Sequence, residues 1–190
     1  GHILDELDEA TVEGWIRVDG WPPSDDLQYY AAYGYGNKPG NWTFFIANGG
    51  AALVIQAGKP GTDSVPVVWY QQVPAIWGHV AWVSGRDENI LYINGREVMR
   101  NPIKGSFSSR IDNDGVHFLG PASEPYGLRL DEWRIWATRR TQEEIQRNMS
   151  ERLTGYEPGL VALWNFDDPD HPGRDATPHG FDGQLKGAAT

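Results

Sequence analysis

The 190-residue sequence contains no cysteine and has no excess of positive charge. Without cysteine, disulfide bonds and thiolate zinc sites are excluded. Only 16 lysine and arginine residues face 26 aspartate and glutamate residues, so the formal net charge is -10. A phosphate backbone would be repelled by this charge, and we expect no nucleic-acid partner. No apolar run approaches the length of a membrane span, so we expect no membrane insertion either.

The missing cysteines leave the cellular compartment open. They fit a cytosolic protein, and equally an exported bacterial protein that needs no disulfides. The start Gly1-His2 is typical of a cloning scar, so any targeting signal would have been removed with the native start. The sequence therefore does not identify the cellular compartment, although we slightly favour an extracellular or periplasmic location.

Aromatic and chain-breaking residues, by contrast, are abundant. Nine tryptophans, eight tyrosines and six phenylalanines stand beside two methionines, together with 23 glycines and 13 prolines. Rings and β-branched residues between frequent breaks suit short strands better than long helices. The composition predicts an all-β fold, and the length suits one domain spanning residues 1–190.

Alternating segments predict where the strands lie. Between Val12 and Val18 apolar residues alternate with others, which is the pattern of a half-buried strand. The pair Asn94-Gly95 lies between two such runs and predicts a type I′ hairpin, because both residues tolerate positive φ. Frequent turn residues favour a two-sheet antiparallel sandwich. Further strands are expected at residues 27–35, 42–47, 51–57, 65–70, 77–84, 116–119, 128–136, 160–166 and 181–185.

One segment has the pattern of a helix. Thr141 and Glu144 have the spacing of a capping box, and Ile145 and Met149 fall on one helical face. Gly155 follows as a stop signal. We expect one short helix near residues 142–152, lying against the β sandwich.

An ordered set of motifs resembles the laminin G-like, concanavalin A-like jelly-roll superfamily. The segments are 11–16 (TVEGWI), 77–82 (WGHVAW), 91–95 (LYING), 130–136 (LDEWRIW) and 159–167 (GLVALWNFD), closed by Asp175 and His179-Gly180. The resemblance covers nearly the whole chain and implies two antiparallel sheets of six or seven strands. It departs at the front, where residues 5–9 replace the usual opening strand. It also implies a domain cut from a larger multidomain protein.

The C-terminal part of the sequence holds an acidic cluster that suits calcium. Calcium binds six to eight hard oxygen ligands, many of them carbonyls from glycine-rich loops. Members of the resembled superfamily often bind it near the meeting termini, and Asp175 matches the closing aspartate of the family. A solvated acidic loop is the equally weighted alternative. The candidate metal ligands are Asp168, Asp170, Asp175 and Asp182.

Aromatic side chains in the first third of the chain form a candidate ligand-binding surface. Half of the residues of each strand in a sandwich face outward, and exposed rings beside amides and carboxylates suit the CH faces of sugars. Packing in the core is the alternative for each ring. The candidate ligand-binding residues are Trp21, Tyr33, Tyr35, Trp42 and Trp69.

Residues 6–9 are similar to the catalytic strand of jelly-roll glycoside hydrolases, where carboxylates occupy alternate positions. Here Glu6 and Asp8 are followed on the same face by Ala10, while Glu9 points the other way in an extended strand. The carboxylate pair required for retaining hydrolysis cannot be assembled from this strand. We therefore expect no enzyme, and a glycoside hydrolase is only the second alternative.

These observations together favour a non-catalytic recognition module that binds a glycan or a protein surface, with or without calcium. A structural or sensory interaction domain, contacting neighbouring domains of a multidomain bacterial protein, is the first alternative. Fold alone does not choose between them.

Overall fold

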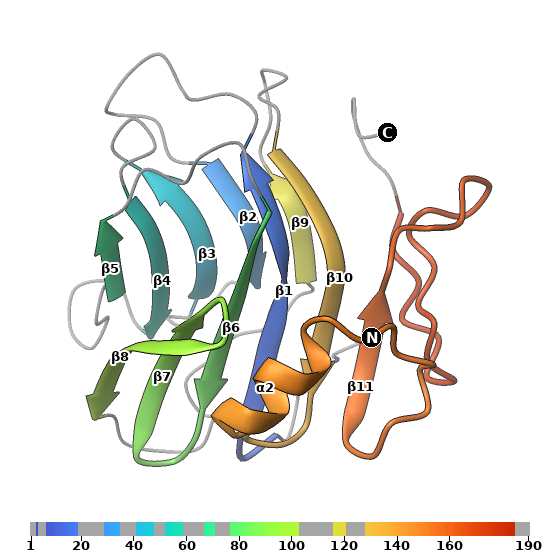
Figure 1. The fold of residues 1–190 in the computed structure, drawn as a ribbon. Coiled ribbons are helices and arrows are strands. Elements are labelled where there is room, and N and C mark those ends of the chain that lie inside the picture. The colour runs from blue at the N-terminus through green and yellow to red at the C-terminus, as the bar shows by residue number, and fades with distance from the viewer. Residues whose placement is uncertain are drawn as a thin grey trace.

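The computed structural model of the chain describes residues 3, 7–18, 29–34, 41–47, 52–58, 67–70, 77–102, 116–120 and 128–184. Within these residues, strands dominate and pair in two sheets, in antiparallel fashion throughout. The predicted all-β, two-sheet fold is therefore confirmed. Figure 1 shows the sheets as two layers, with the helix on the outer side of one of them.

The larger sheet carries most of the described side chains. It has six strands in the order β11-β10-β1-β6-β7-β8. In chain order they are β1 (Ala10–Val18), β6 (Gly78–Ser84), β7 (Glu88–Ile93), β8 (Arg96–Pro102), β10 (Leu128–Trp136) and β11 (Leu160–Trp164). Because β1 lies between β10 and β6, residues far apart in the sequence become neighbours at the centre of this sheet.

The smaller sheet has five strands in the order β5-β4-β3-β2-β9. They are β2 (Tyr29–Gly34), β3 (Asn41–Ala47), β4 (Ala52–Gly58), β5 (Val67–Tyr70) and β9 (Val116–Gly120). Their pairing is continuous apart from a bulge between Tyr30 and Ala32. The predicted strands 27–35, 42–47, 51–57, 65–70 and 116–119 agree with these within one or two residues.

Strand alternation gives the larger sheet two different faces. One face is mainly apolar and forms the main core cluster, with Val12 and Ile16 of β1 beside Trp82 of β6 and Trp133 of β10. The other face mixes apolar residues with buried polar ones, such as Glu13. Gly14 of β1 is required at the centre, because a Cβ there would lie 2.7 Å from the ring of Trp133.

Both ends of the described chain contribute to this core. Ile3 belongs to the main cluster, and Leu7, Phe166 and Phe181 pack against it. The segments near the two termini therefore join one hydrophobic cluster. Among the described residues, no helix has the length and apolar character needed to cross a membrane.

The helix α2 (Gln142–Asn148) begins with the predicted capping box. The backbone N–H of Glu144 donates to Oγ1 of Thr141 at 3.2 Å, and the N–H of Thr141 donates to Oε2 of Glu144 at 2.8 Å. Ile145 is fully buried against residues of β6 and β7. The helix therefore lies on the mixed face of the larger sheet (Figure 1).

The predicted extent of the helix, to about residue 152, is wrong. The helix ends at Asn148 because side chains of the sheet take the carbonyls that follow. Arg134 donates to the carbonyl of Asn148 at 2.6 Å and Trp15 donates through Nε1 to that of Met149 at 2.8 Å. These contacts satisfy the end of the helix without further turns.

The predicted last strand, residues 181–185, is also wrong where the structure describes it, because residues 181–184 are irregular. The backbone of Phe181 bonds to side chains instead of a neighbouring strand: its N–H donates to Asp175 at 2.9 Å and its carbonyl accepts from Trp164 Nε1 at 3.0 Å. The edge of β11 is covered instead by Ala176, whose N–H donates to the carbonyl of Leu163 at 2.8 Å.

Candidate functional site

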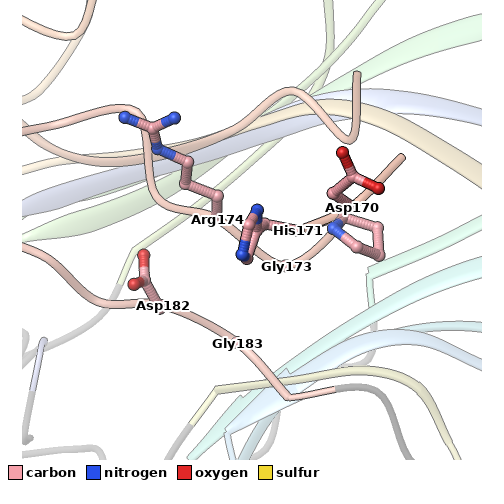
Figure 2. A pocket seen from close by; sticks show the side chains of 7 residues that line it. Asp170, His171, Gly173, Arg174, Asp182 and Gly183 are labelled. Carbon is pink, nitrogen blue, oxygen red and sulfur yellow. The ribbon is translucent and has the colours of Figure 1, made fainter. Parts of the chain in front are cut away.

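A pocket of about 450 Å³ lies among the loops that follow β11. Figure 2 shows Asp182 on one side of it and the side chains of Arg174 and His171 on the other. The pocket is lined by Asp170, His171, Pro172, Gly173, Arg174, Asp182 and Gly183. Its volume falls in the range of small-molecule sites, roughly 300–1,000 Å³.

The two loops that form the pocket are held together through glycine backbone. The N–H of Gly183 donates to the carbonyl of Gly173 at 2.7 Å. A Cβ at position 173 would lie 2.4 Å from the carbonyl oxygen of Gly183, so only glycine permits this close approach. The lining of the pocket therefore combines glycine backbone with polar side chains and Pro172.

Asp168 fixes the turn that carries the lining residues. Its Oδ1 accepts from the backbone N–H of Asp170 at 3.0 Å and of His171 at 3.1 Å. Desolvation raises the pKa of Asp168, but these two hydrogen bonds and the nearby charge of Arg174 outweigh it and lower the pKa. The turn is therefore organised by an ionised carboxylate.

Asp175 organises the same loop from inside the protein. Its carboxylate is buried and accepts four hydrogen bonds: from N–H of Leu163 at 3.0 Å, of Thr177 at 2.9 Å and of Phe181 at 2.9 Å, and from Oγ1 of Thr177 at 2.8 Å. The backbone N–H of Asp175 in turn donates to Asp182 at 2.9 Å. Asp175 therefore ties β11 to both loops of the pocket.

The four predicted metal ligands lie in this one loop region but have different surroundings. Asp170 and Asp182 are exposed and line the pocket, Asp168 holds a turn, and Asp175 is buried and saturated by hydrogen bonds. In the described part of the chain, no three His, Cys, Asp or Glu side chains are placed to hold a metal ion together. Calcium binding at these residues stays a prediction.

The side chains of Arg174 and His171 add donors to the pocket. Arg174 is 69% exposed and lies 3.9 Å from Oδ2 of Asp168, and His171 is 76% exposed. Neither residue is among the candidates named from the sequence. The usable signal was the turn chemistry after Asp168, which brings both residues beside the acidic cluster.

Three of the five predicted ligand-binding rings belong to strands of the smaller sheet. Trp21 and Tyr35 fall outside the described residues. Tyr33 is on β2, Trp42 on β3 and Trp69 on β5, and only their backbone positions are described.

The strand register relates three of these positions. Tyr33 is paired with Thr43, the residue next to Trp42, so Tyr33 and Trp42 occupy opposite faces of the sheet. Trp69 is paired with Leu53, and Leu53 is paired with Ile46, so these three positions share one face of the sheet. Position 42 lies four residues before Ile46 on β3 and is therefore on that face too. Their role in ligand binding stays a prediction.

The segment that is similar to a hydrolase catalytic strand is not a strand in the structure at residues 7–9, and its carboxylates have other partners. Asp8 forms an exposed ion pair with Arg86. Oε1 of Glu9 accepts from the backbone N–H of Arg139 at 3.4 Å. Glu6 lies outside the described residues. The two described carboxylates of this segment therefore have surface partners.

Comparison with known protein families identifies the superfamily of the chain. Residues 2–146 match the family Laminin_G_3, described as the concanavalin A-like lectin/glucanases superfamily. This match covers about three quarters of the chain. The chain belongs to this superfamily. The resemblance found in the sequence motifs is therefore confirmed. No curated protein matches the chain significantly.

Solved structures of the superfamily share the fold at low sequence identity. A putative carbohydrate binding protein from Bacteroides ovatus is 18% identical with a TM-score of 0.62, over 86% of this chain and 46% of that one. The binding domain of botulinum neurotoxin DC, in complex with rat synaptotagmin II, is 16% identical with a TM-score of 0.63, over 78% and 37%. A third structure is of botulinum neurotoxin type C, a toxin whose cell entry depends on interaction with two ganglioside molecules. It is 17% identical with a TM-score of 0.61, over 80% of this chain and 37% of that one.

These similarities establish the jelly-roll fold. The chain spans less than half of the length of each of these solved proteins. By description, the first is a putative carbohydrate binding protein and the second a binding domain, and the third is a neurotoxin that interacts with gangliosides.

Proposed function

We propose that this chain is a non-catalytic recognition module that binds a glycan through the pocket beside β11. The observation that carries the proposal is the composition of that pocket. One loop presents the exposed side chains of Asp170, His171 and Arg174, and the other presents the exposed carboxylate of Asp182 (Figure 2). Carboxylates accept two hydrogen bonds side by side and a guanidinium donates two, which matches neighbouring hydroxyl groups of a sugar.

The comparisons support this class of ligand. Similar folds include a putative carbohydrate binding protein and a neurotoxin structure described by its interaction with gangliosides. A protein surface is the second candidate, and the neurotoxin binding domain in complex with rat synaptotagmin II favours it. In that case the partner would still meet the loops around Arg174 and Asp182, which project beyond the sheet.

The absence of catalysis is part of the proposal. Glycoside hydrolysis requires one carboxylic acid with a raised pKa beside a second, ionised carboxylate. Asp8 and Glu9 are occupied by Arg86 and by the backbone of Arg139. Incubation with polysaccharides should release no reducing sugar, and any release that is abolished by Asp182→Asn would contradict this part.

Two further elements of the proposal rest on the sequence. Calcium bound at Asp168, Asp170, Asp175 and Asp182 would assist the ligand, and those of the rings of Trp21, Tyr33, Tyr35, Trp42 and Trp69 that face outward would offer a second binding surface. A calcium titration, with and without EDTA, tests the first. Alanine substitution of each ring tests the second, because a ligand-binding ring loses affinity while a core ring loses stability.

The central experiment is a glycan array followed by calorimetric titration of the best ligand. Asp182→Asn keeps the oxygen that accepts from Asp175 and removes the charge, and Arg174→Gln removes the guanidinium. Each should weaken binding about tenfold or more, because hydrogen bonds to charged groups contribute roughly 1.5–3 kcal/mol. Arg86→Gln, an exposed arginine whose partner is Asp8, is the matched control and should bind as the parent does.

Two results would contradict the proposal. The first is a glycan that binds all three variants with unchanged affinity, which would place the site elsewhere on the fold. The second is the absence of any glycan ligand together with a protein ligand whose binding depends on Arg174, which would favour the protein-recognition candidate.

A further inference from the structure

Three charged or titratable side chains are buried together beneath α2. Glu13 on β1, His79 on β6 and Arg134 on β10 lie on adjacent strands, and their side chains are 0%, 0% and 1% exposed. Glu13 is paired directly with Arg134 in the strand register. Buried ionisable groups are costly unless they are paired, so the way each is satisfied decides its charge.

Arg134 is well matched by partners other than Glu13. It donates to the carbonyl oxygens of Asn148 at 2.6 Å and Glu151 at 2.9 Å, and to the carboxylate of Glu132 at 3.0 Å. The carbonyls follow the end of α2, where a cation is favoured. Its distance to Oε1 of Glu13 is longer, at 3.8 Å. The charge of Arg134 is therefore already balanced by Glu132.

Glu13 and His79 face each other with atoms that lack partners, and Nε of Arg134 also lacks one among the described residues. Oε1 of Glu13 accepts from Nε1 of Trp136 at 2.8 Å. Within the described residues, Oε2 of Glu13 and both ring nitrogens of His79 have no hydrogen-bond partner. Oε2 lies 3.7 Å from Nε2 of His79. One of these two atoms must therefore carry a proton that the other accepts. In a pair with no net charge, this proton is additional to the one on Nδ1 of the neutral imidazole.

We propose that Glu13 and His79 hold a single proton between Oε2 and Nε2, and that this neutral pair makes the attachment of α2 to the sheet sensitive to pH on both sides of a central window. With no proton, an unbalanced carboxylate would remain beneath the helix. With two protons, an imidazolium would lie beside the guanidinium of Arg134. One proton avoids both buried charges.

The electrostatics of the surroundings agree with a single proton. Burial raises the pKa of Glu13, although the charges of Arg134 and Arg140 and the hydrogen bond from Trp136 oppose this, and Glu144 of α2 adds to it. Burial, followed by the charge of Arg134, lowers the pKa of His79 to about 3. A carboxyl group that keeps its proton beside an imidazole that stays neutral is the one-proton pair.

The pair is connected to α2 through neighbouring side chains. The ring of Trp15 meets that of His79 edge-on at 5.4 Å between centroids, and its Nε1 donates to the carbonyl of Met149. Arg134 holds the carbonyls on the same side. Detachment of this end of α2 would admit water to Glu13 and His79 and return them to ordinary pKa values near 4.5 and 6.5.

The proposal fixes how detachment depends on pH. Between about pH 4.5 and 6.5 the detached state also carries one proton, on the imidazole, so detachment involves no net proton exchange. Above 6.5 detachment releases the proton, and the attached state is lost as the pH rises. Below 4.5 detachment takes up a second proton, and the attached state is lost as the pH falls toward 3. The limiting slope on each side is tenfold per pH unit.

The test is hydrogen exchange of the amides of Ile145 and Met149, converted to a detachment constant and followed from pH 3.5 to 8. The parent should be level between pH 4.5 and 6.5. With Glu13→Gln, detachment should rise up to tenfold per unit as the pH falls below 6.5. With His79→Gln, it should rise up to tenfold per unit as the pH climbs above 4.5. His171→Gln, which removes an exposed histidine, should follow the parent.

A parent profile that slopes within the central window would overturn the proposal, and its direction identifies the alternative. A detachment constant that rises as the pH falls means that the attached pair holds no shared proton. A detachment constant that rises as the pH rises means that the attached pair holds two protons. If a variant fails to fold, NMR of the parent still decides. At pH 5.5 the carboxyl carbon of Glu13 and the ring nitrogens of His79 should show a pair with no net charge, that is, one proton in addition to the N–H of the neutral imidazole. A carboxylate beside a neutral imidazole would refute the pair.

Discussion

Replacing Asp175 by alanine should destabilise the domain with no metal present. The carboxylate is 5% exposed and accepts four hydrogen bonds, two of them from the buried backbone of Leu163 and Thr177. Removing a buried acceptor leaves each donor unsatisfied at a cost of about 1–3 kcal/mol, and these costs are not additive. We expect a loss of about 3–5 kcal/mol in the free energy of unfolding. For a chain of this size that corresponds to a fall in Tm of about 6–20 °C.

The assay is thermal unfolding in EDTA, with Asp170→Ala as the matched control. Asp170 lies five residues away in the same acidic loop, but its side chain is exposed, so its replacement should change stability by less than about 0.5 kcal/mol. A Tm for Asp175→Ala equal to that of the parent in EDTA would refute the structural role assigned to Asp175. It would also mean that the four hydrogen bonds contribute nothing measurable.

The same pair of variants tests the calcium prediction. If calcium binds the folded protein here, millimolar calcium should raise the Tm of the parent by mass action. Asp170→Ala should then lose part of this increase while keeping the Tm of the parent in EDTA. A parent Tm that is the same in calcium and in EDTA would leave Asp175 with its structural role alone.

Three further changes follow from local geometry. Gly14→Ala should cost about 1–3 kcal/mol, measured by urea unfolding, because the new methyl would lie 2.7 Å from the buried ring of Trp133; no loss would show that the ring yields freely. Thr141→Ala should cost about 1 kcal/mol by the same measurement, because α2 loses its N-cap. Hydrogen bonds from Thr141 hold the pKa of Glu144 below its ordinary value, although burial opposes this shift. The Glu144 carboxylate therefore stabilises the protein above about pH 4.5. This contribution is lost as the pH falls through the lowered pKa. Glu144→Gln should flatten that part of the acid profile, and an unchanged profile would contradict it.

Strand positions could be predicted from the sequence where local patterns decide them. Residues 128–136 are predicted as a strand and form β10 with the same bounds, because alternation and flanking breaks agree there. The turn at Asn94 and Gly95 has φ of 48° and 70°, as the type I′ interpretation requires. These features depend on the φ preferences and periodicity of a few neighbouring residues.

The ends of elements could not be predicted in this way. The helix stops at Asn148 because Arg134, 14 residues earlier, takes its carbonyl. The segment at Phe181 is not a strand because Asp175 and Trp164 occupy its backbone groups. Both outcomes depend on side chains whose positions are set by the tertiary fold.

The candidate site shows the same division. The acidic loop could be located from its composition, and the structure places Asp170 and Asp182 in one pocket. The buried role of Asp175 could not be read from the sequence, because its donors come partly from β11, at Leu163. An aspartate that binds metal and one that binds backbone N–H groups have the same sequence signal.

The burial of Glu13 and His79 follows from how α2 is stabilised. A helix of seven residues is too short to persist alone in water, so its stability must come from tertiary contacts. Ile145 supplies an apolar contact, and Nε2 of Gln146 donates to the carbonyl of Gly95 at 2.8 Å. The carbonyls at the end of the helix require donors from the sheet, which is why polar side chains such as Arg134 occupy a buried face. Once a guanidinium is fixed there with its own carboxylate, any other charge on that face opposes the helix. A neutral pair beneath α2 is therefore a condition for the helix to stay attached.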